Sequence, residues 1–416
     1  MKTVIMAGGK GTRISSIASD IPKPMIRIGD KPVLQLEIES LAKQGFKDFV
    51  ITISHLGYVI EGYFKDGSDF GVHIEYYNET TPLGNAGALF KLKDKLKEDF
   101  LLINGDVLFD IDVNRFVHFH KEKGGLVSLF THPNSHPYDS GLLFTDKENC
   151  VIRWLNKEDE RPEYYKNRVN AGIHIVSPLV LNKEIDKEKI DLDRDILKPL
   201  CGSGKMFAYD SSEYVKDMGT PERYEEVCRD YLSGKVKERN LILKQKAIFL
   251  DRDGTINHYV GFLRDINDFE LNQNVAEAIK EINRSKYLAI VVTNQPVVAR
   301  GEVSFAQLDE IHNKMETLLG EKGAYLDGIY FCPHHPDSGY EGEIKELKID
   351  CDCRKPKPGM FIKAEEDFNI DLERSYMIGD SGNDMKAAEA AGCKGIKIDT
   401  DGDLLEAVKT VLEEEK

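Results

Sequence analysis

The chain has 416 residues, of which 41% are hydrophobic and 31% charged, and its formal net charge is -16. A chain of this length is expected to form two domains rather than one hydrophobic core. The negative charge opposes binding to nucleic acid or to an anionic membrane, although local cations and Mg²⁺ can still bind phosphorylated small molecules. No apolar stretch approaches the roughly 20 residues of a membrane span, and the N-terminus lacks a signal peptide, so a cytoplasmic protein is expected.

Strand and helix patterns alternate along the whole chain. Short apolar runs typical of buried strands occur at residues 3–6, 49–53, 100–103, 247–250, 289–292 and 376–378. Apolar residues at helical spacing lie between them, at Leu34, Ile38, Leu41 and Ala42 in the first half and at Val275, Ile279 and Ile282 in the second. This order predicts an α/β protein with two doubly wound, mostly parallel sheets.

A polar segment at residues 233–245 separates the two series of elements. We predict that it is a linker between a domain at residues 1–232 and a domain at residues 246–416. In the first domain, His118 and His120 alternate as they would in a strand. Because the pattern gives neither of them a carboxylate or cysteine partner, we expect ordinary exposed histidines.

A glycine-rich loop follows the first strand, with the sequence Ala-Gly-Gly-Lys-Gly-Thr-Arg at residues 7–13. Glycines let backbone N–H groups approach a triphosphate, and Arg13 can bind the departing pyrophosphate. Lys23, in Pro-Lys-Pro-Met, adds a rigidly placed cation. Carboxylates follow at Asp106, just after a strand, and at Asp217.

The order of these motifs resembles the sugar-1-phosphate nucleotidyltransferase family over residues 1–232. The resemblance implies that Asp106 and Asp217 hold Mg²⁺ and that Arg13 and Lys23 act on the reacting phosphates. The attacking group is a sugar-1-phosphate oxygen, the target is the α-phosphorus of an NTP, and pyrophosphate leaves. The resemblance further implies substrate contacts from Gly8, Gly9, Gly11, Thr12, Gly84, Asn85, Lys157 and Asn170.

The subgroup that the motifs match best is the heptose-1-phosphate guanylyltransferases, which makes GTP the expected nucleotide. Mannose-1-phosphate guanylyltransferases are the next subgroup. No single residue in the sequence identifies guanine, so the nucleobase stays an expectation.

In the second half, polar residues follow three of the expected strands. Asp251 and Asp253 come after the first, Thr293 and Asn294 close the second, and Asp380 follows the third. Open α/β sheets bind their ligands at the carboxyl ends of the strands, so these groups are expected to meet. Lys355 adds a cation, which completes a set suited to a phosphoryl group and a hard metal ion.

This combination resembles the haloacid dehalogenase phosphatase superfamily across nearly all of residues 246–416. The resemblance implies that Asp251 is the nucleophile and Asp253 the general acid and base. Lys355 and Mg²⁺ would neutralise the phosphoryl oxygens, and Thr293 and Asn294 would orient them. The implied Mg²⁺ ligands are Asp251, Asp380 and the carbonyl of Asp253, with Asp384 supporting them.

Three of the seven cysteines lie close together in the sequence. Cys332, Cys351 and Cys353, with His334, offer three thiolates and an imidazole, which suits a closed tetrahedral Zn²⁺ site. We prefer His334 to His335 because Cys-x-His mirrors the spacing of Cys-x-Cys. The alternative is a group of reduced surface cysteines without metal.

The motifs around this cluster resemble the heptose 1,7-bisphosphate phosphatase branch of the superfamily. Histidinol-phosphate phosphatases share the cysteine-rich loop, so the loop alone does not choose between the two substrates. Arg300 and Arg354 are our candidates for binding the phosphate that is not cleaved.

Together the two halves suggest consecutive reactions, because a phosphatase acting on a sugar 1,7-bisphosphate yields a sugar-1-phosphate for the transferase. One alternative pairs a mannose-1-phosphate guanylyltransferase, or another hexose-1-phosphate nucleotidyltransferase, with an unrelated small-molecule phosphatase. Another is a regulatory sensor of nucleotide sugars that has lost catalysis. The expected partners are an NTP and sugar phosphates, and the sequence leaves open whether the chain forms a homo-oligomer.

Overall fold

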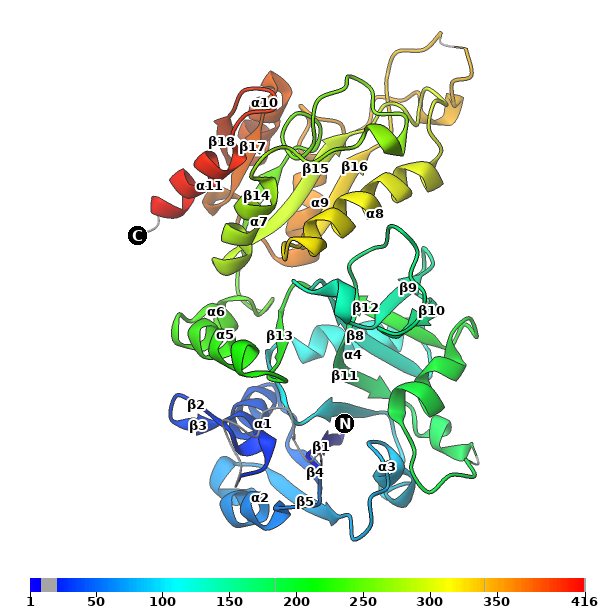
Figure 1. The fold of residues 1–416 in the computed structure, drawn as a ribbon, viewed down its shortest axis with the longest axis vertical. Coiled ribbons are helices and arrows are strands. Elements are labelled where there is room, and N and C mark those ends of the chain that lie inside the picture. The colour runs from blue at the N-terminus through cyan, green and yellow to red at the C-terminus, as the bar shows by residue number, and fades with distance from the viewer. Residues whose placement is uncertain (9–20, 184, 340, 415–416) are drawn as a thin grey trace. The chain divides into compact units, whose positions relative to one another are not determined.

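The structure, a computed structural model, describes residues 1–8, 21–183, 185–339 and 341–414 (Figure 1). It divides into two compact units. The first unit comprises Met1–His132, Leu143–Trp154 and Asn170–Asn240, and the second comprises Pro133–Leu142, Leu155–Val169 and Leu241–Lys416. No helix in the described ranges is long and apolar enough to cross a membrane.

Within the described residues, the first unit is built on a mixed sheet of nine strands. At its centre, β1 (Thr3–Met6) pairs in parallel with β4 (Asp48–Ile53) and β6 (Phe100–Asn104). On its other side β4 pairs in parallel with β5 (His73–Asn78). β6 pairs on its other side with β11 (Val169–Val176), which runs antiparallel to it. The remaining strands are β8 (Val127–His132), β9 (Leu142–Thr145), β10 (Val151–Leu155) and β12 (Met206–Asp210).

Helices cover both faces of this sheet, because alternate strand residues point to opposite sides. Ile5 and Ile103 pack in one apolar cluster with α1 (Val33–Lys43), α2 (Gly57–Phe64) and α4 (Val113–Lys123). Their neighbours Val4 and Leu102 pack in another cluster with α3 (Gly87–Lys91). Smaller elements of this unit are β2 (Arg27–Ile28), β3 (Lys31–Pro32), β7 (Val107–Asp110), β13 (Tyr214–Asp217), α5 (Pro221–Leu232) and α6 (Lys235–Glu238).

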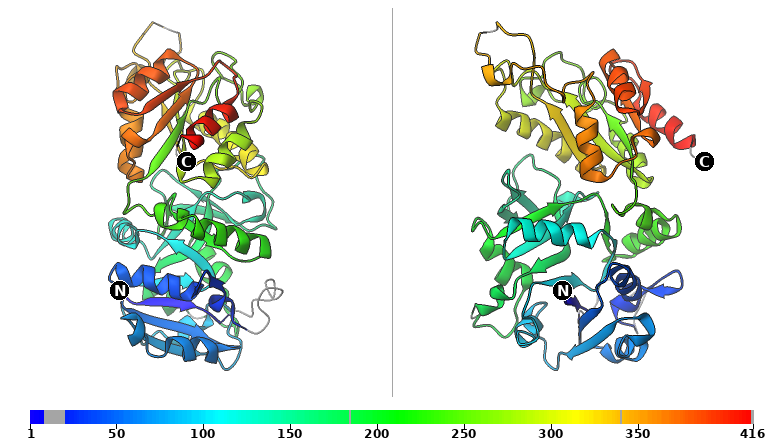
Figure 2. Two further views of the ribbon diagram at one scale, coloured as in Figure 1. Left: turned by 90° about the vertical axis from the view of Figure 1, so that its left-hand side faces the viewer. Right: turned by 180° about the vertical axis from the view of Figure 1, so that it is seen from behind.

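The second unit contains a five-stranded sheet in the order β16-β15-β14-β17-β18, with every pair parallel. Figure 2 gives two further views of the fold. Ile248 and Leu250 pack in an apolar cluster with three helices on one face of this sheet. Ala247 and Phe249 pack in a second apolar cluster with two other helices on the opposite face. The strands are β14 (Lys246–Leu250), β15 (Tyr287–Asn294), β16 (Gly328–Cys332), β17 (Tyr376–Gly379) and β18 (Lys394–Lys397). The helices are α7 (Val275–Arg284), α8 (Phe305–Glu321) and α11 (Leu404–Glu413) on the first face, and α9 (Gly359–Phe368) and α10 (Gly382–Ala391) on the second.

These layers confirm the prediction of two α/β folds with helices on both faces of largely parallel sheets. The first sheet is more mixed than expected, since β11 and β9 run antiparallel to their neighbours. Part of the predicted linker is helical, because α6 lies inside residues 233–245.

Two earlier segments of the chain belong to the second unit and contact its helix α8. The backbone N–H of Tyr165 donates to Thr317 Oγ1 at 2.9 Å, and that of Asn167 donates to Glu316 Oε2 at 2.6 Å. The two units therefore do not separate at a single point in the sequence, because segments 133–142 and 155–169 interrupt the first.

The expectation for His120 was wrong. It lies in α4, not in a strand, and only 2% of it is exposed. Its Nδ1 is 2.8 Å from Ser128 Oγ and its Nε2 is 3.4 Å from Asp99. Phe116 and His120 are four residues apart, and this helical spacing places both on the buried face of α4.

Candidate functional site

The carboxyl ends of three adjacent strands form the site of the second unit. β14 lies between β15 and β17, and the chain order of the strands reverses around it, which is where open α/β sheets bind ligands. Asp251 follows β14, Thr293 and Asn294 end β15, and Asp380 follows β17. The structure thus brings together the groups that the sequence placed at separate strand ends.

Lys355 is the cation at the centre of this site. Only 3% of it is exposed, and its Nζ lies 2.8 Å from Asp251 Oδ1 and 2.6 Å from Asp384 Oδ1. Burial opposes a charged lysine, but the two carboxylates outweigh it and raise the pKa of Lys355. Burial, with a contribution from Asp384, raises the pKa of Asp251 to about 6 despite the opposing effect of Lys355.

The acidic groups here fit a divalent cation. Asp251, Asp380 and Asp384 each offer one carboxylate oxygen, and these oxygens lie within 4.8 Å of one another. Lys355 supplies one positive charge against three carboxylates, so the set retains negative charge that a hard metal ion can balance. Thr400 Oγ1 donates to Asp380 Oδ2 at 2.6 Å and fixes that carboxylate.

Asp253 lies in a separate network of hydrogen-bond donors. Arg252 donates to both of its oxygens, Gln295 Nε2 donates to Oδ2 at 2.7 Å, and Asn257 Nδ2 donates to Oδ1 at 3.1 Å. Burial acts to raise the pKa of Asp253, but Arg252 and the other donors outweigh it and lower this pKa. These donors favour the carboxylate form of Asp253, which is the form that can accept a proton. The acid and base role of Asp253 stays a prediction.

Asn294 has a contact that its sequence position does not suggest. Its Nδ2 donates to the Lys355 carbonyl at 2.9 Å, and the Lys355 N–H donates to its Oδ1 at 3.0 Å. Asn294 thus fixes the backbone that carries the central cation. Thr293 is buried, and its Oγ1 accepts from Gln295 at 2.9 Å. Binding of phosphoryl oxygens by these two residues stays a prediction.

The two arginines proposed for the uncleaved phosphate have different surroundings. Arg300 lies 4.1 Å from the centre of the Phe262 ring, and its Nη1 is 3.9 Å from Glu302. Arg354 donates from Nη1 to the His334 carbonyl at 3.2 Å. The cysteine and histidine cluster therefore supports Arg354 directly.

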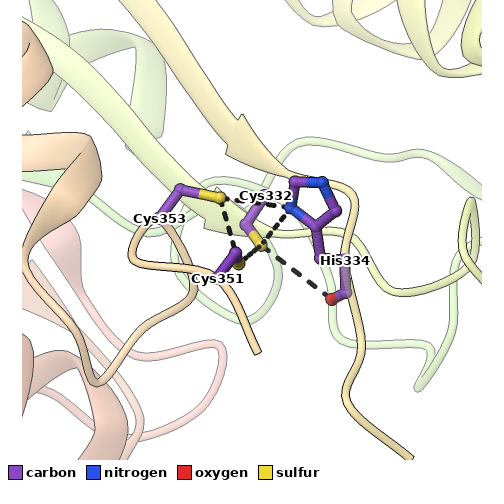
Figure 3. A group of neighbouring side chains, drawn as sticks. All are labelled: Cys332, His334, Cys351 and Cys353. Atoms are coloured by element: carbon purple, nitrogen blue, oxygen red, sulfur yellow. Dashed lines mark hydrogen bonds between the residues drawn. The ribbon is translucent and has the colours of Figure 1, made fainter. Parts of the chain in front are cut away.

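The four predicted zinc ligands converge on one point (Figure 3). Cys351 Sγ is 3.5 Å from Cys332 Sγ and 3.3 Å from Cys353 Sγ, and His334 Nδ1 is 3.3 Å from Cys353 Sγ. Tetrahedral Zn–S bonds of about 2.3 Å would separate the sulfurs by about 3.8 Å, so the spacing is close to that of a zinc site. A hydrogen bond between the Cys332 and Cys353 side chains raises the pKa of Cys332 and lowers the pKa of Cys353.

In the first unit, Lys23 forms an ion pair with Asp106. β13 pairs with β7 so that Asp217 lies opposite Val107, next in sequence to Asp106. Burial acts to raise the pKa of Asp217, but Arg223 and Lys23 outweigh it and lower this pKa. Arg223 Nη1 lies 3.0 Å from Asp217 Oδ2. Lys23 therefore lies close to both carboxylates, and binding of Mg²⁺ by Asp106 and Asp217 stays a prediction.

The predicted substrate-binding loops are partly described. Ser54 Oγ donates to the Gly8 carbonyl at 2.6 Å, and Asn85 Oδ1 accepts from the Leu192 N–H at 2.7 Å. Gly84 has a φ of +81° and packs so closely on the Ile190 backbone that a Cβ there would lie 2.3 Å from its carbonyl oxygen. The predictions for Gly9, Gly11, Thr12 and Arg13 lie outside the described residues.

The last two predicted sugar contacts differ in their environment. Asn170 Oδ1 accepts from the buried His174 at 3.0 Å and from the Gly172 N–H at 3.2 Å. Lys157 is exposed, and its Nζ is 3.6 Å from Glu158. Sugar binding by either residue stays a prediction.

Comparison with known proteins matches two different families to the two halves of the chain. Residues 2–234 match the nucleotidyl transferase family, and residues 352–412 match the HAD-hydrolase-like family. The chain is 47% identical over 145 residues to the D-glycero-beta-D-manno-heptose-1,7-bisphosphate 7-phosphatase of Salmonella typhi, covering 35% of this chain and 75% of that protein. With the enzyme of the same name from Vibrio cholerae it shares 46% identity over 156 residues, covering 38% of this chain and 81% of that protein.

The chain belongs to the nucleotidyl transferase family and, in its second half, to the family of these phosphatases. It joins a nucleotidyltransferase to a phosphatase of the haloacid dehalogenase type. Among solved structures it is similar to HddC from Yersinia pseudotuberculosis, with 26% identity, a TM-score of 0.49, and coverage of 55% of this chain and 99% of that one.

Several contacts in the two sites were not foreseen from the sequence. In the transferase, Arg223 pairs with Asp217 from the first turn of α5, six residues later. In the phosphatase, Gln295 and His312 join the Asp253 network. Gln295 follows the Thr-Asn pair directly, so its position was a usable signal. The sequence gives no comparable signal for His312, which comes from α8.

Proposed function

We propose that this chain catalyses two consecutive steps in the synthesis of a nucleotide-activated heptose. The phosphatase removes the 7-phosphate of D-glycero-D-manno-heptose 1,7-bisphosphate, and the transferase joins the resulting heptose 1-phosphate to an NTP. The observation that carries the proposal is the presence, in one chain, of a nucleotidyl transferase and a segment that is 44–47% identical over 145 residues to heptose bisphosphate 7-phosphatases. GTP is the expected nucleotide, and the motif resemblance supports it.

The phosphatase reaction follows from the residues at the strand ends. A carboxylate oxygen of Asp251 attacks the 7-phosphorus, and the bond from phosphorus to the sugar oxygen breaks. Asp253 enters this step in its protonated form and gives that proton to the leaving alkoxide. A water then attacks the aspartyl-phosphate, Asp253 takes the proton, and inorganic phosphate leaves Asp251. Lys355, held between Asp251 and Asp384, balances the charge of the phosphoryl oxygens.

The transferase reaction requires positioning and charge balance more than proton transfer. The 1-phosphate oxygen of the sugar attacks the α-phosphorus of the NTP, and the bond to pyrophosphate breaks. Lys23 and Arg13 are assigned to the phosphates, and Asn170 and Lys157 to the sugar. Gly84, whose loop packs closely on the Ile190 backbone, is assigned with Asn85 to substrate contacts.

Metal ions are part of the proposal. Asp106 and Asp217 in the transferase, and Asp251, Asp380 and the Asp253 carbonyl in the phosphatase, are assigned to Mg²⁺, and the position of Asp384 supports a role beside them. Mg²⁺ supplies Lewis-acid neutralisation of phosphoryl oxygens. Cys332, His334, Cys351 and Cys353 are assigned to a structural Zn²⁺. None of the seven cysteines, all of which the structure describes, forms a disulfide bond. This supports a reducing compartment such as the cytoplasm.

One reaction mixture tests the whole proposal. The protein is incubated with heptose 1,7-bisphosphate, Mg²⁺ and each NTP in turn, and the products are identified by mass. We expect inorganic phosphate, pyrophosphate and a nucleoside diphosphate heptose, with most product from GTP. Formation of the nucleotide sugar from mannose 1-phosphate but not from the heptose would contradict the substrate assignment.

A further inference from the structure

Arg252, between the nucleophile and the acid-base residue, has the most buried guanidinium at the phosphatase site. Its side chain is 0% exposed. Nη2 lies 2.9 Å from each oxygen of Asp253, Nε lies 3.2 Å from Oδ1, and Nη2 also lies 2.8 Å from Gln295 Oε1. A guanidinium donates in one plane, so these contacts fix its plane relative to the carboxylate.

The other edge of the guanidinium faces a histidine on α8. Arg252 Nη1 lies 3.3 Å from His312 Nε2, and His312 is 7% exposed. Because a guanidinium only donates, Nε2 must be the nitrogen without a proton, and Nδ1 carries it. Burial and the charge of Arg252 lower the pKa of His312 to about 3, despite the opposing effect of Asp253, so the ring is a neutral acceptor.

Packing holds the histidine in this orientation. The His312 ring lies 5.4 Å from the ring of Phe331 on β16, measured between centroids, and Met315 on the same helix is buried in the apolar core. Gln295 closes the network, since its backbone N–H donates to the Cys332 carbonyl at 2.7 Å. Asp253 is therefore connected by hydrogen bonds to β16 and α8 as well as to its own loop.

Orientation matters because the same carboxylate must protonate an alkoxide and later deprotonate a water. A small misplacement of a catalytic group costs a large part of its effect. If Nη1 loses its acceptor, a buried donor is left unpaired, and the guanidinium can tilt toward another partner. Tilting would turn the Asp253 carboxylate with it.

We propose that Arg252 and His312 are positioning residues of the phosphatase, with His312 fixing the guanidinium and the guanidinium fixing the Asp253 carboxylate. This inference rests on the proposed acid-base function of Asp253. It assigns a function to a residue of α8 whose hydrogen bond is made to Arg252 and not to an assigned substrate or metal ligand.

A double-mutant cycle tests the proposal on the full-length protein. We measure kcat and KM for heptose 1,7-bisphosphate with His312→Leu, Asp253→Asn and the double variant. General acid-base catalysis is worth about 10²-fold to 10⁴-fold, so misplacing the carboxylate should lower kcat by about tenfold to hundredfold with little change in KM. In the Asp253→Asn background the same His312→Leu change should lower kcat by less than about twofold.

Two further variants separate positioning from folding. His312→Gln keeps an acceptor and should restore most of the lost kcat. Met315→Ala, which removes a buried side chain from the same helix, should lower the melting temperature with similar effects on kcat in both backgrounds. Arg252→Lys keeps the charge but not the planar donor geometry, and it should reproduce the kcat loss of His312→Leu if it folds.

The outcomes are distinguishable. If Asp253→Asn alone leaves kcat unchanged, the proposed function of Asp253 fails, and this inference with it. If Asp253→Asn lowers kcat but His312→Leu lowers it equally in both backgrounds, only the positioning inference is overturned. Failure of His312→Gln to restore kcat would also count against it.

Discussion

The described residues of the two sites differ in the contacts that hold them and in how the chain brings them together. In the phosphatase, Lys355 already bridges Asp251 and Asp384, and Asp253 is held by several donors. In the transferase, the described contacts are fewer. Lys23 pairs with Asp106 and Arg223 with Asp217, and the predicted phosphate-binding loop lies outside the described residues.

The origin of this difference is topological. The phosphatase residues follow neighbouring parallel strands, so formation of the sheet brings them together at one edge. The transferase carboxylates come from positions 111 residues apart, since Asp106 follows β6 and Asp217 ends the antiparallel strand β13. In the transferase, therefore, the pairing of β13 with β7 places Asp217 beside the residue that follows Asp106, whereas in the phosphatase one parallel sheet aligns the strand ends.

The largest expected effect comes from removing the phosphatase nucleophile. Asp251→Asn should reduce phosphatase turnover on the order of 10⁴-fold or more, because no covalent intermediate can form. Nucleotidyl transfer, measured as pyrophosphate release from GTP and heptose 1-phosphate, should remain near wild type. Asp268→Asn, a change at an exposed aspartate of the same unit, is the control. Loss of both activities in Asp251→Asn would show that the two sites are not independent.

The reciprocal variant acts on the transferase. Asp217→Asn should reduce nucleotidyl transfer by about 10²-fold to 10³-fold, since it removes a charge that stabilises the transition state, and should spare the phosphatase. The loss should shrink when the Mg²⁺ concentration is raised, because a weakened metal site can be refilled by mass action. Asp94→Asn, at a fully exposed side chain, should change neither rate. A phosphatase defect in Asp217→Asn would contradict the assignment.

The same contrast explains how far the sequence could predict these sites. The placement of Asp251, Thr293 and Asp380 was predictable because each lies at the carboxyl end of a strand, and neighbouring parallel strands end at the same edge of the sheet. His312 was not, because its function depends on how α8 packs over the sheet. In the transferase, Asp106 and Asp217 came from the family motif, while the contact of Arg223 depends on where α5 begins.

His120 shows a failure of a different kind. Local alternation suggested a strand, although Val113, Phe116 and His120 have the spacing of one buried helical face. Asn85 and Asn294 show a third limit of prediction from the sequence, which concerns side-chain contacts. The sequence places both beside a ligand site, but it could not show that their side chains bind the backbones of Leu192 and Lys355.

An intermediate effect is expected for recognition of the uncleaved phosphate. A charged hydrogen bond from a guanidinium to phosphate contributes roughly 1.5–3 kcal/mol. Loss of that contact, in Arg300→Ala or Arg354→Ala, should therefore lower kcat/KM for heptose 1,7-bisphosphate by about tenfold to hundredfold. Hydrolysis of a simple aryl phosphate should change little, and Arg284→Ala on the surface of α7 should affect neither substrate.

The wild-type enzyme gives a second measurement of this selectivity. It should hydrolyse heptose 1,7-bisphosphate much faster than heptose 1-phosphate, because removing the 1-phosphate would destroy the transferase substrate. Equal rates on the two compounds would contradict the model of consecutive steps, even if both arginine variants behaved as expected.

The smallest expected effect is on stability, at the cysteine cluster. We expect about one zinc ion per chain that survives dialysis sufficient to remove Mg²⁺. Cys351→Ser removes one ligand, and a loss of about 2 kcal/mol would lower the melting temperature of the phosphatase by about 4–8 °C. Cys393→Ser, at a buried cysteine outside the cluster, should keep the zinc even if it also lowers the melting temperature.

Measuring the zinc content therefore distinguishes a variant that has lost a metal ligand from a variant in which the change of a buried cysteine only lowers stability. Because Arg354 donates to the His334 carbonyl, Cys351→Ser should also weaken selection of the bisphosphate, by less than Arg354→Ala does. The nucleophile and Lys355 have their own partners, so turnover of an aryl phosphate should persist. A wild-type protein without zinc, or a Cys351→Ser variant with full zinc and unchanged stability, would show that these cysteines are only reduced thiols.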